Sequence, residues 1–564
     1  MKRLWSIIPQ CYRRRTLWVA ATIFLRALLN FVGVATLLPI LLLILDSDAI
    51  STNPHLAKAY SMVGTDSYSK FVIVVCITIL GIILLKNIAT LLLYRTERNY
   101  IYGLYKHLSE ALYLTYHSRG YGFVKQNNSA VLTRNVNVVS LMFVVGVLKP
   151  LATIISEALL FMLIMGAIAW YTPTIALLAT LLFLPIVAIS YCIMRSRLHD
   201  IGEMENSAQR LKSRIVAESF RGYVDIEIGG TFPQMFSKFE RALDDIVILR
   251  KRNATLSMLP QVFTEVGLAV GLVTLIIISL GYSGEDAAIT FGIFAVAAIR
   301  LVPSVRGIMS SWSTMRYNLY TIDTMNDTQE CITTPPTHEP ERLRFDSAIE
   351  LRNVSFAFDD ASTPTINNLS LSIKRGERVG IQGTSGIGKT TLFNLILGLY
   401  RPTSGKIVVD GVELTDTNIR KWQNSVGYVS QSVFITEGTI AENIAFGIEP
   451  NNIDYTRLDK ALEYADLKDF TDSLEHGIIT RIGEQGSRLS GGQRQRIGIA
   501  RALYKGCDVL LFDEATSSLD NTTEQNINSA IERLSAENRA LTIVVIAHRD
   551  SSLGYCDRII TLGE

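Results

Sequence analysis

The sequence predicts two domains of different class: an α-helical domain with six membrane-spanning helices, followed by an α/β domain of the P-loop class. Two observations lead to this prediction. Long apolar runs fill roughly the first 310 positions, far more than a soluble domain carries. The rest of the 564-residue chain alternates short β-type runs with helical segments and contains a glycine-rich loop.

Six apolar stretches are long enough to cross a membrane, for which a helix needs about 20 apolar residues. They are Leu17–Leu45, Phe71–Leu93, Leu141–Trp170, Ile175–Met194, Leu256–Leu280 and Ala287–Ile308. Buried helices of a large soluble protein are usually shorter and keep one polar face. We therefore expect a transmembrane domain with long cytoplasmic extensions over residues 1–324, a polar linker over 325–347 and a soluble domain over 348–564.

Basic residues are grouped at alternate ends of the expected spans, and such grouping marks the cytoplasmic side. The groups precede spans one and five and follow spans two and four: Arg13–Arg15, Arg250–Arg252, Arg95 with Arg98, and Arg195 with Arg197. The N-terminus and the soluble domain are therefore expected in the cytoplasm. The long charged segments between spans two and three and between spans four and five are expected to be helical extensions. Each extension is expected to turn once, near Gly120–Asn128 and near Ala217–Gly230.

Several ionisable residues lie within or near the expected spans. A charge at the centre of a bilayer costs about 2.5–3.5 kcal/mol on insertion scales, so each needs a partner or an aqueous cavity. For Arg26, Lys149 and Glu157, a structural ion pair or a position at the membrane interface explains the charge as well as a functional role does. Cations that share a water-filled cavity suit a phosphate or pyrophosphate head group. The three candidates for such a substrate site are Lys86, Arg300 and Arg306.

The soluble domain contains a phosphate-binding loop that fits G-x-x-x-x-G-K-[ST]. Its residues are Gly383, Thr384, Ser385, Gly386, Ile387, Gly388, Lys389 and Thr390. A β-type run, Arg378–Gln382, precedes the loop, and a helix is expected from Thr391 onward. Backbone N–H groups and the helix N-terminus would hold the phosphates of ATP. Lys389 would reach the β- and γ-phosphates, and Thr390 would ligate Mg²⁺.

A second acidic motif follows an apolar run, Val509–Phe512. The run has the composition of a buried strand, and it ends in Asp513 and Glu514. Asp513 is placed to hold Mg²⁺ through water, and Glu514 is placed to activate the attacking water as a general base.

With these motifs and one more, the chain resembles the ABC transporter superfamily. The further motif is Leu489 followed by Ser490, Gly491, Gly492 and Gln493, which matches the signature of that family. In such proteins the signature of one subunit caps the nucleotide held by the other, so the resemblance implies a homodimer. It also implies roles for four more residues. Gln431 would sense Mg²⁺, His548 would contact the γ-phosphate, Asp520 would belong to the loop that crosses the dimer interface, and Phe358 would stack on adenine.

Six spans ahead of the cassette on one chain resemble the exporter arrangement. Within the exporters, the helical half is most similar to bacterial lipid-linked oligosaccharide flippases, on the stretches Pro260, Glu265–Gly267 and Arg300–Ser304. The resemblance implies a bacterial inner membrane and an amphipathic, anionic cargo such as a polyprenyl-diphosphate-linked oligosaccharide. Two alternatives stay open: a general lipid or multidrug exporter, and an ATP-gated channel or regulator. We expect no nucleic-acid partner.

Overall fold

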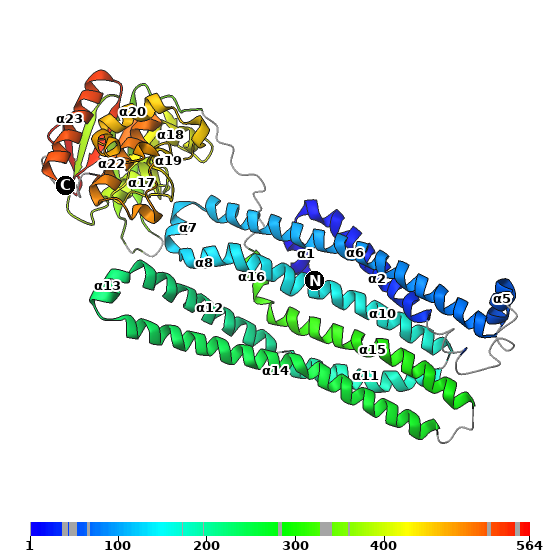
Figure 1. The fold of residues 1–564 in the computed structure, drawn as a ribbon. Coiled ribbons are helices and arrows are strands. Elements are labelled where there is room, and N and C mark those ends of the chain that lie inside the picture. The colour runs from blue at the N-terminus through cyan, green and yellow to red at the C-terminus, as the bar shows by residue number, and fades with distance from the viewer. Residues whose placement is uncertain are drawn as a thin grey trace. The chain divides into compact units, whose positions relative to one another are not determined.

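The computed structural model describes residues 2–36, 43, 54–64, 68–171, 173–195, 197–279, 285–326, 341–358, 361, 363–515, 520–547 and 553–563. The chain divides into two compact units, Met1–Pro335 and Pro336–Glu564 (Figure 1). The division falls inside the linker expected at 325–347.

The first unit is helical throughout the residues described. Its α-helices are α1 (Lys2–Ile7), α2 (Gln10–Ala35), α5 (Pro54–Val63), α6 (Tyr68–Ser118), α7 (Gly120–Gln126), α8 (Ser129–Arg134), α9 (Ser140–Phe143), α10 (Lys149–Tyr171), α11 (Pro173–Met194), α12 (Arg197–Arg221), α13 (Tyr223–Ile228), α14 (Phe232–Ser279), α15 (Glu285–Tyr317) and α16 (Tyr320–Asn326). Two π-helical turns, Asn135–Val139 and Val144–Leu148, join α8, α9 and α10 into one continuous rod.

Four helical rods in the described part of the chain are long and apolar enough to cross a membrane: Gln10–Ala35, Tyr68–Ser118, Ser129–Trp170 and Phe232–Thr274. They coincide with the first, second, third and fifth expected spans. The part of the first expected span beyond Ala35 lies almost wholly outside the described residues. The other two expected spans coincide with α11 and α15, whose side chains are described only in part. The chain is a multi-pass membrane protein.

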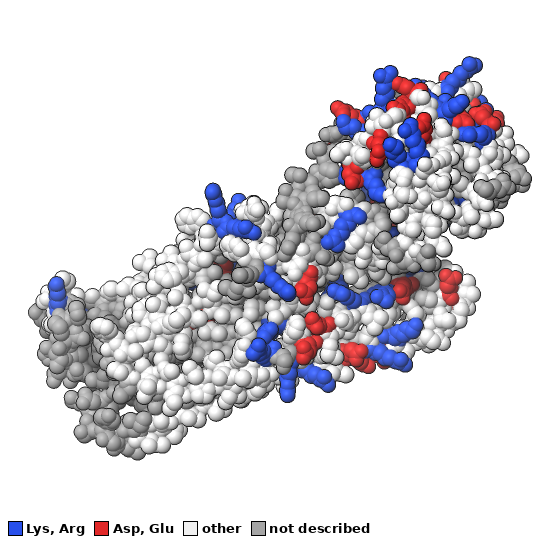
Figure 2. Space-filling model, turned by 180° about the vertical axis from the view of Figure 1, so that it is seen from behind, with Lys and Arg blue, Asp and Glu red and all other residues white. Residues whose placement is uncertain are grey.

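The helices continue well beyond their apolar parts. Helix α6 has 51 residues, and its apolar first half leads into a charged second half. The short helices α7 and α13 make the two expected turns, and both lie at the same end of the helical unit (Figure 1). Figure 2 shows charged side chains gathered over this part of the unit, while the rest of its visible surface is almost free of charge.

Two ionisable residues of the expected spans, Arg26 and Glu157, have partners inside the helical unit. Arg26 of α2 forms a salt bridge with Glu97 of α6 at 2.8 Å, and both side chains are largely buried. Ser304 of α15 donates a hydrogen bond to Glu157 of α10 at 2.7 Å. Arg26 therefore has a structural ion pair, one of its two expected explanations, whereas the described partner of Glu157 is a neutral hydroxyl.

The second unit is an α/β domain with two sheets. An antiparallel sheet has the order β2-β1-β4-β5, and a parallel sheet has the order β6-β7-β8-β3-β9. The strands are β1 (Ala348–Phe356), β2 (Ile366–Lys374), β3 (Arg378–Gln382), β4 (Ser404–Val409), β5 (Val412–Glu413), β6 (Val426–Val429), β7 (Val509–Asp513), β8 (Thr542–Ile546) and β9 (Arg558–Thr561).

Helices cover the parallel sheet, whose central strands β7 and β8 are buried along their whole length. Continuous apolar runs are typical of parallel strands that are covered on both faces. The helices are α17 (Lys389–Ile396), α18 (Ile419–Ser425), α19 (Ile440–Ile444), α20 (Tyr455–Tyr464), α21 (Lys468–Asp472), α22 (Gly491–Lys505) and α23 (Asn521–Glu537). Residues at the carboxyl ends of β3, β6, β7 and β8 share one edge of the sheet, which is where α/β proteins bind ligands.

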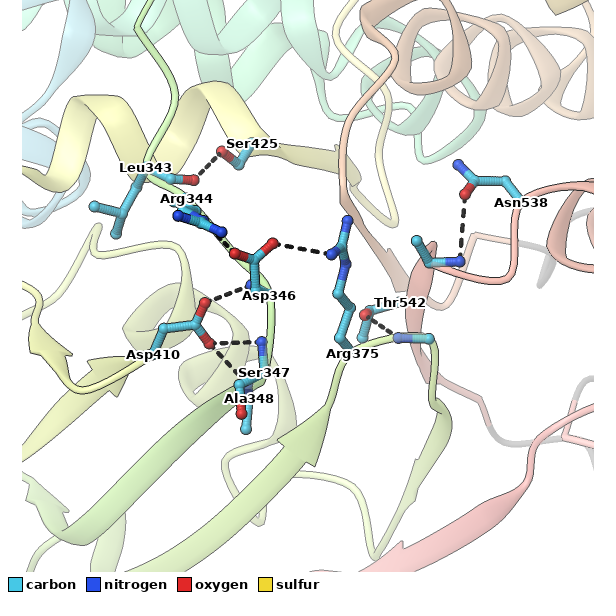
Figure 3. Close-up of polar contacts among 12 residues, drawn as sticks. Leu343, Arg344, Asp346, Ser347, Ala348, Arg375, Asp410, Ser425, Asn538 and Thr542 are labelled. Carbon is cyan, nitrogen blue, oxygen red and sulfur yellow. Dashed lines mark hydrogen bonds and ion pairs between the residues drawn. The ribbon is translucent and has the colours of Figure 1, made fainter.

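The start of β1 is held by a tight turn between β4 and β5 (Figure 3). Asp410 and Gly411 both have positive φ, at 50° and 82°, as a two-residue hairpin requires. The Asp410 carboxylate accepts hydrogen bonds from the backbone N–H groups of Asp346, Ser347 and Ala348, the last two at 2.9 Å. One side chain therefore joins the residues at the start of β1 to the turn between β4 and β5.

Candidate functional site

The phosphate-binding loop joins β3 to α17. Strand β3 occupies the expected residues, Arg378–Gln382, and the helix begins at Lys389. Three loop glycines have positive φ: Gly383 at 158°, Gly386 at 84° and Gly388 at 105°. A Cβ on Gly388 would lie 3.1 Å from the Thr365 side chain, so the turn into the helix is both strained for other residues and closely packed. The loop therefore presents backbone N–H groups at a helix N-terminus, an arrangement that binds phosphate.

Lys389 is buried beneath this loop. Its Nζ donates hydrogen bonds to the backbone oxygens of Gly383 at 2.8 Å and Thr384 at 3.2 Å. The loop thus positions the ammonium group, which would help to neutralise the charge of bound phosphates. Ser385, Ile387 and Thr391 complete the segment around it, with Ser385 exposed and Thr391 within the first turn of α17.

Phe358 follows β1, in the connection to β2 that packs against the phosphate-binding loop through Thr365. Its half-buried ring meets Phe356 edge-on, with centroids 5.0 Å apart, and meets Tyr400 edge-on at 5.6 Å. The ring is therefore fixed in orientation beside the loop, and its role toward adenine stays a prediction.

A pair of oxygen ligands lies between the phosphate-binding loop and β7. The Thr390 hydroxyl donates to Asp513 Oδ1 at 3.3 Å, and the Tyr428 hydroxyl donates to Oδ2 of the same carboxylate at 3.3 Å. Burial raises the pKa of Asp513, while these two hydrogen bonds act in the opposite direction. A divalent cation would favour the ionised form. Hydroxyl and carboxylate oxygens are ligands that Mg²⁺ prefers, so Thr390 and Asp513 fit a magnesium site.

Glu514 follows Asp513 in a backbone conformation that is uncommon outside glycine, with φ at 50°. Its N–H donates to the Ile546 carbonyl at 3.0 Å, which fixes the end of β7 against β8. The Gln431 side chain, located after β6, donates a hydrogen bond from Nε2 to Glu514 Oε2 at 2.7 Å. Backbone strain of this kind gathers at active sites. The glutamine and the candidate general base are therefore in direct contact.

The signature motif forms the N-terminus of α22. Ser490 is the N-cap residue, and its side chain accepts a hydrogen bond from the Gln493 N–H at 3.1 Å. Gln493 Oε1 in turn accepts from the Ser490 N–H at 2.8 Å, which completes a capping box. The Ser490 hydroxyl proton remains available as a donor, beside the helix N-terminus made by Gly491 and Gly492.

Two further residues expected to act on the nucleotide, Asp520 and His548, follow β7 and β8 in the sequence. Asp520 caps α23 by accepting a hydrogen bond from the Thr523 N–H at 3.0 Å. His548 lies outside the described residues. The strand before it, β8, lies between β7 and β3 in the sheet.

The helical unit gives the three candidate substrate cations different surroundings. Lys86 of α6 packs on Gly33 of α2. Arg306 instead forms a salt bridge with Glu265 of α14 at 3.4 Å. The role of these cations toward a substrate stays a proposal.

Residues 366–517 match the family described as "ABC transporter". The chain belongs to the ABC transporter family. Similar proteins include "ATP-dependent lipid A-core flippase" of Bordetella avium (strain 197N), 33% identical over 393 residues, with 68% of this chain and 66% of the relative covered. The flippase of the same name from Ralstonia nicotianae is 31% identical over 399 residues, with 70% of this chain and 66% of that protein covered. The chain thus aligns with somewhat less than two thirds of the length of these two relatives.

A solved structure shares the fold of this ABC transporter over nearly its whole length. It is described as "Structure of a bacterial Atm1-family ABC exporter with ATP bound", with a TM-score of 0.79 and 21% sequence identity. The match covers 98% of this chain and 93% of the other. The expected fold class, an α-helical transmembrane domain followed by an α/β P-loop nucleotide-binding domain, is confirmed.

The structure of this ABC transporter also places residues for which the sequence predicts no role. Tyr428 supports Asp513, and it does so because β6 lies beside β7 with Tyr428 opposite Leu511. The sequence signal for this role is a tyrosine in the penultimate position of a β-type run, in a domain whose apolar strand Val509–Phe512 ends in acidic residues. Glu97 is the buried partner of Arg26.

Proposed function

We propose that this protein hydrolyses ATP to move an anionic, lipid-linked substrate across a bacterial inner membrane, most specifically a polyprenyl-diphosphate-linked oligosaccharide. For the hydrolysis, the observation that carries the proposal is the convergence of Thr390 on Asp513 and of Gln431 on Glu514 at one edge of the parallel sheet. For the cargo, it is the position of Lys86 and Arg300 on membrane-spanning helices, where neither forms an ion pair with another described residue.

In the proposed reaction, each residue of the cassette has one task. The phosphate-binding loop and Lys389 hold the β- and γ-phosphates, and Thr390 and Asp513 would hold Mg²⁺, which neutralises charge on those phosphates. Glu514 accepts a proton from the attacking water while Gln431 fixes the orientation of its carboxylate. His548 is proposed to contact the γ-phosphate.

The proposed active unit is a homodimer, in which the signature of one subunit completes the nucleotide site of the other. The capped N-terminus of α22 supports this assignment, because Ser490 and the glycines after it offer donors that suit a γ-phosphate. Asp520 is proposed to lie at the subunit interface. A closed C₂ dimer is also the commonest arrangement of identical subunits.

ATP binding would then act on the helices through α7 and α13, which make the only turns of the two long extensions in the described residues. A ligand shifts a conformational equilibrium only by its difference in affinity for the two states. We propose that the cytoplasm contains the N-terminus and the cassette, since the basic clusters gather on that side of the spans.

The cargo proposal depends on the charges inside the helical unit. A charge in a span is unfavourable without a counter-charge, and Lys86 and Arg300 have none among the described residues. A diphosphate would supply that counter-charge to Lys86 and Arg300 together. Arg306 already has Glu265 as a partner, so we propose a smaller contribution from it.

A second candidate cargo is suggested by the relatives that are named lipid A-core flippases. A general lipid or multidrug exporter is the broader alternative, and it does not require the paired cations.

The test is the ATPase rate of purified protein in lipid, with added polyprenyl-diphosphate oligosaccharide, lipid A-core or neither. We expect the diphosphate lipid to stimulate wild type and a Lys106→Gln control, whose exposed ammonium group lies on the same helix as Lys86. Stimulation should be lost in Lys86→Gln/Arg300→Gln. Stimulation by lipid A-core alone would favour the second candidate, and equal stimulation of the double variant would contradict a role for the cations.

A further inference from the structure

An apolar cavity of about 620 Å³ lies at the beginning of the chain, between α1, α2, α6 and α10. Its walls are mainly apolar side chains: Leu4, Val19, Ile23, Leu148, Leu151 and Ile155. The volume falls within the range of pockets that enclose small-molecule ligands, about 300–1,000 Å³. None of the residues that line it belongs to the candidate substrate or nucleotide site.

One cation on the wall of this cavity has an unused hydrogen-bond donor. The Nε of Arg13 is buried and has no hydrogen-bond partner among the described residues. The guanidinium group lies over the Trp5 ring, 5.9 Å from its centroid. Leaving a donor of a charged group unsatisfied is costly, so an anionic acceptor that reached this guanidinium group would be favourable.

The neighbouring polar groups of the wall are satisfied within the protein. The hydroxyls of Thr16 and Tyr100 are hydrogen-bonded to each other at 2.7 Å, and Thr16 also donates to the Tyr12 carbonyl at 2.9 Å. The cavity therefore combines an apolar interior with one cationic donor, and this combination matches a lipid whose head group is an anion.

The surroundings of the cavity have the character of a membrane interface. Leu17 and Trp18 of α2 are exposed, Trp18 at 76%, next to the basic cluster Arg13–Arg15. Tryptophan and arginine gather where a bilayer meets water. Ile7 at the end of α1 is buried, which anchors that short helix against the bundle.

We propose that an anionic phospholipid of the surrounding membrane binds in this cavity, with an acyl chain between α2, α6 and α10 and its phosphate on the Arg13 guanidinium. Moving an acyl chain from a bilayer into an apolar cavity exchanges one apolar surrounding for another, so the chain adds little selectivity. Selectivity comes from the charge-assisted bond between phosphate and guanidinium. The lipid acts as a fixed component of the helical unit and is distinct from the transported cargo.

The test is native mass spectrometry of purified full-length protein titrated with dioleoyl-phosphatidylglycerol or dioleoyl-phosphatidylcholine. Wild type should retain one phosphatidylglycerol per chain more tightly than phosphatidylcholine. Arg13→Gln should weaken phosphatidylglycerol binding by about ten-fold, the effect of losing one charge-assisted hydrogen bond. Arg14→Gln is the matched control, because Arg14 is exposed, carries the same charge and does not line the cavity.

A second variant tests the cavity without changing its charge. Ala152 lines the wall, and Ala152→Phe would fill space that the acyl chain needs. Loss of the tightly bound lipid in both Arg13→Gln and Ala152→Phe, with Arg14→Gln unchanged, is the expected result. Equal weakening by Arg13→Gln and Arg14→Gln would indicate attraction to the basic cluster in general and would overturn the proposal. So would unchanged binding in Ala152→Phe.

Discussion

Gln431 donates a hydrogen bond to Glu514, with 2.7 Å between Nε2 and Oε2, and so joins the loop after β6 to the residue after β7. The contact holds the carboxylate in one orientation at the edge of the sheet. Glu514 itself has a positive φ of 50°, so its position is determined by the surrounding structure at a cost in backbone strain.

Glu514→Gln should bind ATP with an affinity close to that of wild type and should hydrolyse it slowly. The substitution keeps the shape and a hydrogen-bond acceptor for Gln431, and it removes the base. General-base catalysis contributes about 10²–10⁴-fold, which is the expected loss of turnover. Phosphate release and nucleotide binding are measured in parallel, with the exposed Glu532→Gln as control. Turnover like that of wild type would remove Glu514 from the mechanism.

Gln431→Ala should reduce turnover more than nucleotide affinity, because it frees the Glu514 carboxylate to rotate and leaves the phosphate-binding loop intact. The comparison is kcat against KM for ATP in the same lipid preparation. A rise in KM with unchanged kcat would contradict this role. It would mean that Gln431 binds the nucleotide equally in the ground state and in the transition state and does not orient the base.

Lys389→Ala should abolish measurable ATP binding. The side chain supplies charge to the phosphates, and its hydrogen bonds to the carbonyls of Gly383 and Thr384 also hold the loop in shape. Lys406→Ala removes an exposed lysine elsewhere in the cassette and is the control. Fluorescent-nucleotide titration makes the measurement, and near-normal affinity in Lys389→Ala would contradict the assignment of the loop.

Glu97→Gln should destabilise the helical unit by about 3–5 kcal/mol, since it leaves Arg26 buried without its counter-charge. Glu110→Gln lies on the same helix, and its exposed pair with Lys106 should contribute less than about 1 kcal/mol. Thermal unfolding in detergent compares the two. Equal melting temperatures for the two variants would show that the buried pair is dispensable. The double variant Arg26→Gln/Glu97→Gln should recover part of the stability that Glu97→Gln loses.

Asp410→Asn should lower the melting temperature of the protein at neutral pH. The difference in melting temperature between wild type and variant should become smaller as the pH is lowered. Burial disfavours the charged carboxylate, but the three backbone N–H donors outweigh it, and the pKa of Asp410 lies below the ordinary value of 3.8. A depressed pKa contributes stability that is fully present above the ordinary value and is lost as the pH falls through the lowered one. A difference that stays constant from pH 7 to pH 3 would rule out this charge as its source.

Much of the nucleotide site could be predicted from the sequence because its motifs have fixed local geometry. Strand β3 ends at Gln382 as expected, and Ser490 begins a helix. The helix after the phosphate-binding loop begins at Lys389, two residues before the expected Thr391, because Gly388 in the left-handed region is its N-cap. The turns at α7 and α13 also fall within the expected ranges.

Contacts between distant segments could not be predicted in the same way. One sequence does not specify the rotation of a helix about its axis, and this rotation decides which span residues meet. Arg300 and Arg306 are six residues apart, which places them roughly 120° apart around α15. The structure accordingly pairs Arg306 with Glu265, while Arg300 forms no ion pair with another described residue. The order of the strands, which puts Tyr428 beside Asp513, is likewise a property of the fold.

The most direct test of the proposed function is translocation of a fluorescent polyprenyl-diphosphate oligosaccharide in proteoliposomes, followed by quenching from one side of the membrane. We expect ATP-dependent movement of this lipid by wild type, no movement above background by Glu514→Gln, and strongly reduced movement by Lys86→Gln/Arg300→Gln. Movement by Glu514→Gln at the rate of wild type, or movement by wild type that does not require ATP, would contradict the proposed function.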